Sequence, residues 1–243
     1  GLSSTIGWLI GGSAGSSAAL GADASKGAET ITCALAVTAG DVIQISSTDT
    51  FETLSNQPKG ELAEVLSVSG GVITMKGGLY DSYTAATTTV TKLNLPRVTI
   101  EGEAAFLRNS NQQGLQVAYA RDVLLGGLYG EGARERLFYL NHVFGATADN
   151  IKGRDFWYSG TSTSYGLVAA ATQHLTVISP DLRGGRHAVS HGGFMPCRDI
   201  TYLGGTVDNY HASGMKSFDF HGDCENVRVS GATILNGLTA QCS

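Results

Sequence analysis

The sequence predicts an all-β protein, a right-handed single-stranded parallel β-helix with a β-rich N-terminal part. Glycine supplies 33 of the 243 residues and charged side chains only 15%, a composition without the Ala-, Glu- and Lys-rich texture of long helices. A short β-branched strand that usually ends in a glycine corner recurs about every 25 residues through the C-terminal part of the chain. A second short strand follows inside each of the first five repeats, and no helical pattern separates the two.

The first strand of each repeat is anchored on its first apolar residue. The predicted anchors are Val98, Val123, Ile151, Leu175, Ile200 and Val227. The predicted second strands are residues 114–119, 136–140, 166–170, 187–191 and 217–221. Stacking each strand on its counterpart about 4.8 Å along an axis buries one face of every strand. Leucine-rich repeats share the period but need a leucine frame that is missing, and propeller blades need about 40 residues.

The N-terminal part follows a different pattern. We expect residues 1–40 to be a Gly/Ser-rich segment that can supply first rungs, and residues 41–95 to be a β-rich cap or irregular first coils. Strands are predicted at 41–45, 61–68, 72–76 and 87–93, with a hairpin turn at 69–71. The coils, about six rungs, are expected from residue 96 to residue 243. We also expect that the chain stops short of the natural end of the β-helix, because no capping segment follows the last repeat.

Composition narrows the function classes. A net charge of −5 argues against a dedicated nucleic-acid binder, which usually has a basic face. Four cysteines in a chain of this length do not make a disulfide scaffold. No segment is typical of a membrane span, and the glycine-rich stretch at 11–15 lacks the lysine of a phosphate loop. We therefore expect no cofactor, no resident metal and no membrane span.

The densest polar patch falls in the last two second strands. Aligned by their ends, these strands place His191 beside His221 and Val189 beside Asp219, with Phe218 and Phe220 pointing inward. The candidate catalytic residues are Arg186, His187, His191, Asp219 and His221.

Three chemistries are open for this patch. A uronic-acid lyase needs a base and a cation, which histidine and Arg186 can supply. A glycosidase needs two carboxylates, for which Asp219 with Asp208 or Asp223 is available. Three histidines with Asp219 also resemble a divalent-metal site. Against all three stands a structural role, in which these side chains bond to neighbouring loops or subunits.

Candidate substrate-binding residues surround the patch. They are Lys216, Asp155, Trp157, Tyr158 and Tyr210. An aromatic ring offers an apolar face to sugar C–H groups, although a core aromatic ladder explains residues 156–158 as well. The charged residues at 131–136 are interpreted as a solvated turn. Cys197 and Cys224 are expected to be neighbours in adjacent rungs, either as buried thiols or as a disulfide.

Several of these segments resemble a known family. Residues 39–45, 59–62 and 96–102 are similar to the lead-in to the coils in bacteriophage tail spikes with a right-handed parallel β-helix. Arg186-His187 in one rung and residues 218–221 in the next add to the resemblance, which covers roughly residues 40–243.

The resemblance implies a homotrimer in the phage tail that binds, and often cleaves, a bacterial capsule or O-antigen polysaccharide at the cell surface. It also implies attachment to other tail or baseplate proteins through a missing N-terminal part. β-Helices serve many functions. The alternatives are therefore a non-catalytic appendage or adhesin, and a cellular polysaccharide lyase or epimerase.

Overall fold

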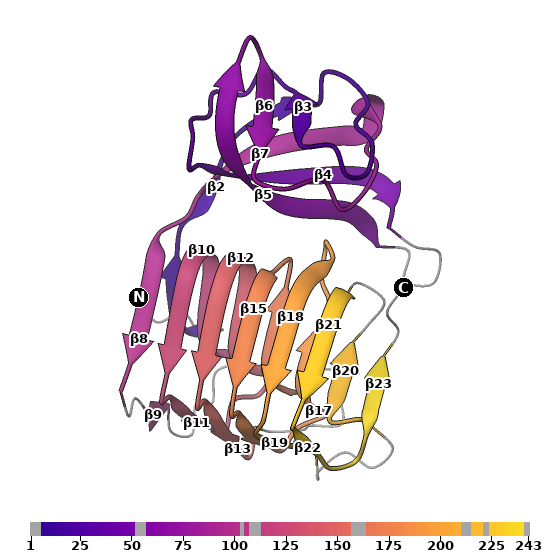
Figure 1. Ribbon diagram of the computed structural model, residues 1–243. Helices are drawn as coiled ribbons and strands as arrows, with labels where there is room; N and C mark the ends of the chain where they lie inside the picture. The colour runs from indigo at the N-terminus through magenta and orange to yellow at the C-terminus, as the bar shows by residue number, and fades with distance from the viewer. Residues whose placement is uncertain are drawn as a thin grey trace.

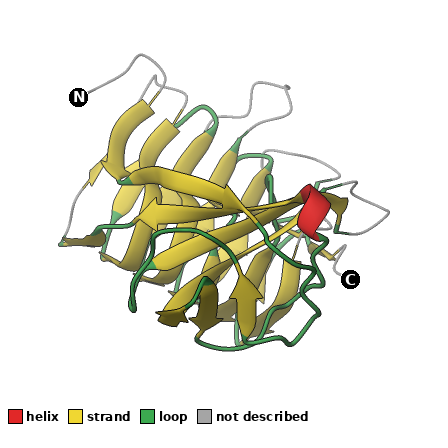
Figure 2. Cartoon of the chain, turned by 90° about the horizontal axis from the view of Figure 1, so that it is seen from above, coloured by secondary structure: helices red, strands yellow, loops and turns green. Residues whose placement is uncertain are grey.

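The computed structural model has two stacked parts, an antiparallel sheet and a parallel β-helix (Figure 1). It describes residues 6–51, 57–102, 105–106, 113–156, 164–209, 215–220 and 224–240. Seen from above, the described chain is built of strands and loops, with one 3₁₀ turn at Ala85–Thr87 (Figure 2). No helix among these residues is long and apolar enough to cross a membrane.

Six strands in the order β2-β7-β4-β5-β6-β3 form the N-terminal sheet. They are β2 (Ser13–Ala19), β3 (Thr30–Thr32), β4 (Val42–Thr50), β5 (Pro58–Ser69), β6 (Val72–Met75) and β7 (Thr88–Asn94). Gly70 and Gly71 make the predicted turn between β5 and β6, with φ of 57° and 79°. A two-residue hairpin turn of this kind needs positive φ at both positions, which glycine supplies without strain. The sheet buries its own apolar core, which includes Ile43, Ile45 and Ile73.

Three columns of parallel strands form the β-helix. The first column contains β8 (Arg97–Glu101), the C-terminal halves of β10 (Gln113–Gly126) and β12 (Arg136–Asp149), then β15 (Gln173–Ile178), β18 (Cys197–Leu203) and β21 (Cys224–Ser230). The second contains β1 (Ile6–Gly11), the N-terminal halves of β10 and β12, then β14 (Tyr165–Ala170), β17 (His187–His191), β20 (Phe218–Phe220) and β23 (Leu238–Ala240). The third contains β9 (Ala105–Phe106), β11 (Tyr129–Glu131), β13 (Lys152–Arg154), β16 (Asp181–Arg183), β19 (Thr206–Asp208) and β22 (Thr233–Ile234).

The recurring glycine corner is a left-handed backbone position. The residues that follow the six first-column strands all have positive φ, and they are Gly102, Gly127, Asn150, Ser179, Gly204 and Gly231. At the neighbouring position, a Cβ on Gly205 would come within 2.3 Å of the Pro180 carbonyl oxygen. The chain therefore turns sharply at the same level in each rung, which explains the repeat seen in the sequence.

One predicted anchor is wrong. The first column aligns Val123 with Ala146, and Ala146 with Leu175, whereas Ile151 lies just before β13 in the third column. The strand around Ala146 consists of small residues, so the β-branched pattern does not mark it. A parallel strand that is bonded on both edges holds its place through the backbone, and Ala146 still belongs to the core as a small residue.

The inward positions of the three columns share one core. Along the first column, Leu125 pairs with Ala148, and Val177 pairs with the fully buried Tyr202. The second column contributes Leu115, Phe138, Leu167, Val189 and Phe218 in register. These ladders are the main apolar cluster of the protein, and they fix which side chains of each strand point outward.

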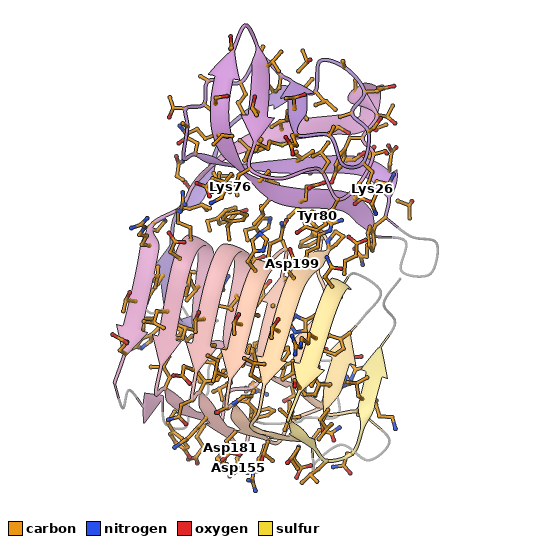
Figure 3. The ribbon with its side chains drawn as sticks, in the orientation of Figure 1. Lys26, Lys76, Tyr80, Asp155, Asp181 and Asp199 are labelled. Carbon is orange, nitrogen blue, oxygen red and sulfur yellow. The ribbon has the colours of Figure 1, made fainter. Side chains whose placement is uncertain are left out.

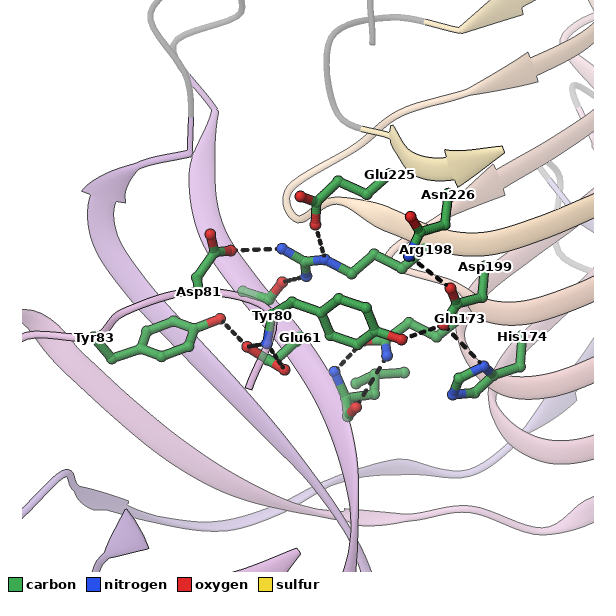
Figure 4. A network of polar contacts seen from close by, with 12 residues as sticks. Glu61, Tyr80, Asp81, Tyr83, Gln173, His174, Arg198, Asp199, Glu225 and Asn226 are labelled. Carbon is green, nitrogen blue, oxygen red and sulfur yellow. Dashed lines mark hydrogen bonds and ion pairs between the residues drawn. The ribbon is translucent and has the colours of Figure 1, made fainter. Parts of the chain in front are cut away.

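A buried polar network joins the sheet to the β-helix (Figure 4). The Arg198 guanidinium donates to Asp81 at 2.5 Å, to Glu225 at 2.6 Å and to the Gly60 carbonyl, and its side chain has no exposed area. The Gln173 amide bonds both backbone groups of Leu62. Together these contacts fix the N-terminal sheet over the starting ends of the first-column strands.

Candidate functional site

The predicted polar patch lies on the outward face of the second column. We call the six residues that form it the outer patch: Arg136, Tyr139, Tyr165, Arg186, His187 and Asp219. Arg136, Tyr165 and His187 occupy one line of register across β12, β14 and β17. The alternation of faces is interrupted just after this line, where two consecutive residues of β12 and of β17 both belong to the core: residues 137–138 and 188–189. Tyr139 and Asp219 occupy a second line, with Ser190 of β17 between them in the register. The patch therefore draws its side chains from four successive rungs.

His187 and Asp219 form the centre of the outer patch. Nε2 of His187 lies 3.3 Å from Oδ2 of Asp219, and the two side chains are only 5% and 6% exposed. On the other side of the ring, Nδ1 lies 2.6 Å from the Lys216 carbonyl oxygen. A carbonyl can only accept, so Nδ1 carries a proton. The contact between Nε2 and the carboxyl is then favourable when one further proton is shared between these two groups. Such a pair can both donate and accept a proton.

Aromatic rings and guanidinium groups surround this pair. The Tyr165 ring stacks on His187 with centroids 5.7 Å apart. Burial raises the pKa of Tyr165, and the Asp219 charge adds to that rise, while Arg186 and Arg136 oppose it. The Arg136 guanidinium lies over the Tyr139 ring at 4.4 Å. Two cations and two rings thus share this face with one carboxylate.

The predicted register of β17 and β20 is wrong by one residue. Val189 pairs with Phe218, Ser190 with Asp219, and His191 with Phe220. His191 therefore points into the core, stacks on Phe220 and contacts the Tyr202 hydroxyl at 2.7 Å. The physical reason is that side chains along a strand alternate between its two faces. Phe218 and Phe220 stack on the inward positions of the preceding rung, Val189 and His191. Those two positions face inward because they stack in turn on Leu167 and Ala169. His191 is accordingly not part of the outer patch.

The other predicted residues are spread more widely. Lys216 is exposed beside the outer patch, and Asp155 is exposed at the end of β13. Figure 3 shows Asp155 near Asp181 at the lower end of the β-helix, far from the junction marked by Tyr80 and Asp199. Phe156, next to Asp155, is a core residue. Asp208, a candidate partner of Asp219, accepts a hydrogen bond from Asn236 at 2.7 Å. Five candidates, namely Trp157, Tyr158, Tyr210, His221 and Asp223, lie outside the described residues.

Sequence reasoning missed Tyr139 and Tyr165 and interpreted Arg136 as part of a solvated turn. All three occupy the outward lines of register that pass through His187 and Asp219. Following those lines back by one to three rungs would have found them.

Cys197 and Cys224 are register neighbours, as predicted. Both are fully buried and no disulfide joins them, so the disulfide alternative is wrong. The described parts of the chain hold no group of three His, Cys, Asp or Glu side chains that could bind a metal ion.

Three solved structures have the same architecture. The tailspike protein gp49 of Pseudomonas phage LKA1 matches 98% of this chain at a TM-score of 0.83 and 24% identity. The tailspike gp61 of Pseudomonas phage phi297 matches 98% at 0.79 and 18%. The gp54 tailspike of Acinetobacter baumannii bacteriophage AP22, solved in complex with A. baumannii capsular saccharide, matches 95% at 0.77 and 21%.

The match spans the sheet and the coils together. The chain covers 41%, 45% and 40% of those three proteins, respectively. No family model matches the sequence, and no curated protein matches it. The likeness is therefore one of fold: this chain has the parallel β-helix architecture, with its N-terminal β sheet, of phage tailspike proteins.

Proposed function

We propose that this chain is part of a phage tailspike that binds a polysaccharide of the bacterial surface, and that the outer patch is the binding site. The shared fold supports this function, as does the capsular saccharide bound to the phage AP22 tailspike. On this proposal the protein belongs to the phage tail and acts at the bacterial cell surface.

The observation that carries the proposal is the composition of the outer patch. Tyr139 and Tyr165 offer ring faces to sugar C–H groups, and Arg136 and Arg186 offer planar donors that suit a carboxylate. Among the described residues, Nε of Arg136 has no hydrogen-bond partner. Arginine next to tyrosine on an outward sheet face favours a polysaccharide that carries acidic sugars.

The outer patch also suggests how such a chain would be cleaved. In an elimination, a base removes the proton next to the sugar carboxylate, the bond to the leaving oxygen breaks, and that oxygen takes up a proton. His187 with Asp219 is the acid/base pair, and Arg186 holds the carboxylate and stabilises the developing charge. Asp219 is the sole carboxylate of the outer patch, so elimination fits the described residues better than hydrolysis, which needs two.

The binding proposal is tested with Arg186→Ala against Arg183→Ala. Arg183 is a partly exposed arginine of the third column, bonded to Asp181, and serves as the matched control. Purified acidic capsular polysaccharides and O-antigens are screened by biolayer interferometry. We expect Arg186→Ala to weaken binding about tenfold or more, since a hydrogen bond to a charged group contributes about 1.5–3 kcal/mol. Equal affinity of the two variants for a polysaccharide that the wild type binds would contradict the site assignment.

The cleavage proposal is tested separately with His187→Gln and Asp219→Asn. Elimination releases oligosaccharides with a new double bond, which absorb in the ultraviolet, whereas hydrolysis releases only reducing ends. We expect the wild type to generate the absorbing product and both variants to lose it while still binding. Reducing ends without the absorbance would identify a hydrolase, and binding without any product would identify an adhesin.

We propose that the functional unit is a homotrimer, which other tail proteins hold on the virion. Phe194, in the loop before β18, is 80% exposed, which is unusual for so large an apolar side chain. Light scattering coupled to size-exclusion chromatography measures the mass directly. A mass near three chains supports the trimer, and a monomer contradicts it for this chain.

A further inference from the structure

We propose that the cavity between the N-terminal sheet and the β-helix is a second saccharide site, which binds one uncharged pyranose ring. The cavity holds about 270 Å³. Residues 61–64 of β5, together with residues 75–80 at the end of β6 and beyond it, line one side. Phe144, Gln173 and His174 line the other. It lies at the starting ends of the first-column strands, whereas the outer patch is on the second column.

The walls of the cavity are held in place before any ligand arrives. Gln173 bonds both backbone groups of Leu62 and so ties β15 to β5. Asp199 contacts the Tyr80 hydroxyl and lies 3.2 Å from Nδ1 of His174, which ties the segment after β6 to the coils (Figure 4). A preformed pocket loses less entropy on binding than one that must be ordered by its ligand.

The groups left for a ligand are those of a sugar site. The Phe144 ring meets the His174 ring edge to face at 5.1 Å, and provides an apolar surface for sugar C–H groups. Glu64 lies 3.7 Å from Nζ of Lys76, longer than the 2.7–2.9 Å of a charge-assisted hydrogen bond. Each of the two groups can therefore take a sugar hydroxyl, which donates to the carboxylate in one case and accepts from the ammonium in the other. Nδ1 of His174 faces Asp199, which leaves Nε2 for a third hydroxyl.

Size and charge define the ligand class. The cavity is slightly smaller than the roughly 300–1,000 Å³ of pockets that hold drug-sized ligands, so one ring fits and a chain does not. The other carboxyl of the cavity, Glu61, is occupied by the Tyr83 hydroxyl and the Tyr80 N–H. Arg121 also lies 3.9 Å from Glu64, but its shorter ion pair, at 3.3 Å, is with Asp122. With Arg121 paired to Asp122, the charges of Glu64 and Lys76 balance each other at the cavity, which favours an uncharged ring over a uronic acid. The choice of a saccharide as the ligand rests on the proposed function; the cavity and its polar groups do not.

The test is an NMR titration of the ¹⁵N-labelled 243-residue chain. The probes are methyl glucoside, methyl galactoside, N-acetylglucosamine and glucuronate, each up to about 100 mM because single sugars bind at the millimolar level. We expect at least one uncharged probe to shift the amide signals of Lys76, Gly78 and His174, and glucuronate to bind more weakly. Lys76→Gln should weaken that binding about tenfold through loss of a charged donor. Lys26→Gln, an exposed lysine of the same N-terminal part, is the matched control and should leave it unchanged.

Each result decides the inference. Absence of shifts around the cavity with all three uncharged probes would overturn it, as would equal affinity in the two lysine variants or preference for glucuronate. Suppose that polysaccharide binding depends on Arg186 but no sugar shifts the amide signals around the cavity. The proposed function would then remain supported, and the second site would be ruled out. If a sugar binds at the cavity but no polysaccharide binds at the outer patch, the second site would be supported and the proposed function of the outer patch would be contradicted.

Discussion

The junction around Arg198 and the outer patch are built from the same residue types, but they use them differently. At the junction, the Arg198 guanidinium has three acceptors and stacks near the Tyr80 ring at 4.8 Å, with no exposed area. In the outer patch, the Arg136 guanidinium contacts a ring face and the arginines are partly exposed. A buried guanidinium whose three nitrogens each have an acceptor is typical of a structural contact, whereas an arginine with a nitrogen to spare beside a nearly buried His–Asp pair is typical of a binding site.

The strongest test of this comparison is Arg198→Met. Methionine keeps much of the apolar stem but leaves two carboxylates and the Gly60 carbonyl without their donor. Removing one partner of a buried ion pair costs about 3–5 kcal/mol, and we expect a loss of that order in the free energy of unfolding measured in urea. Arg97→Met is the matched control, since the Arg97 side chain is 77% exposed and its contact to Asp122 is at the surface; we expect a loss under about 1 kcal/mol. Similar losses in the two variants would show that the junction does not stabilise the fold.

A second test uses the pH dependence of Glu61 at the same junction. Burial raises the pKa of Glu61, and hydrogen bonds from Tyr80 and Tyr83 oppose that rise only in part. A group whose pKa is higher in the folded state contributes stability below its unfolded pKa, about 4.3, and that contribution is lost as the pH rises through the folded value. Glutamine does not ionise, so Glu61→Gln should gain stability relative to the wild type between pH 4 and neutral pH. The gain should be about 1.4 kcal/mol for each pH unit that separates the folded pKa from the unfolded pKa.

Urea unfolding of Glu61→Gln and wild type at several pH values measures that gap directly. Glu29→Gln, an exposed glutamate next to β3, serves as the control. A gap that does not change with pH, or that changes equally in the control, would mean that the Glu61 carboxyl is better solvated than its 2% exposure indicates.

The comparison also separates what the sequence could predict from what it could not. Features set by local chemistry were predictable: the β5–β6 turn at Gly70-Gly71, the corners of the coils, and the pairing of Cys197 with Cys224. Features set by packing between rungs were not. The strand at Ala146 has no β-branched signal, and the β20 register depends on where Phe218 and Phe220 fit in the core.

Contacts between the two parts were the hardest to foresee. Arg198 and Asp81 are 117 residues apart in the chain, and nothing in the local pattern of either segment marks the other. For the outer patch, residue types near His187 and Asp219 were enough to predict that these two side chains lie together, but not to assign every neighbour. His191 was assigned to it although it faces inward, and Tyr165 was missed although it stacks on His187.

The smallest expected effect concerns a third arginine–carboxylate group, which lies on the third column. Asp181 of the third column contacts Arg154 and lies 2.8 Å from Nε of Arg183, with side chains 27–43% exposed. Burial alone would raise the pKa of Asp181, but the two arginines outweigh it and lower the pKa. A lowered pKa contributes stability above the unfolded value, about 3.9, and that stability is lost as the pH falls through the folded value.

Solvent screens this group, so Asp181→Asn should cost under about 1 kcal/mol at pH 6, and the gap to the wild type should close as the pH falls below 4. Thermal unfolding of the two proteins between pH 6 and pH 2.5 measures it, with Asp149→Asn, an exposed aspartate at the end of β12, as the control. A loss as large as that expected for Arg198→Met would show that exposure does not distinguish structural from replaceable charges in this fold. A loss of stability near zero would show that Asp181 behaves like a solvated surface charge. Burial would then be the property that distinguishes the stabilising contacts of Arg198 from the more exposed arginine contacts.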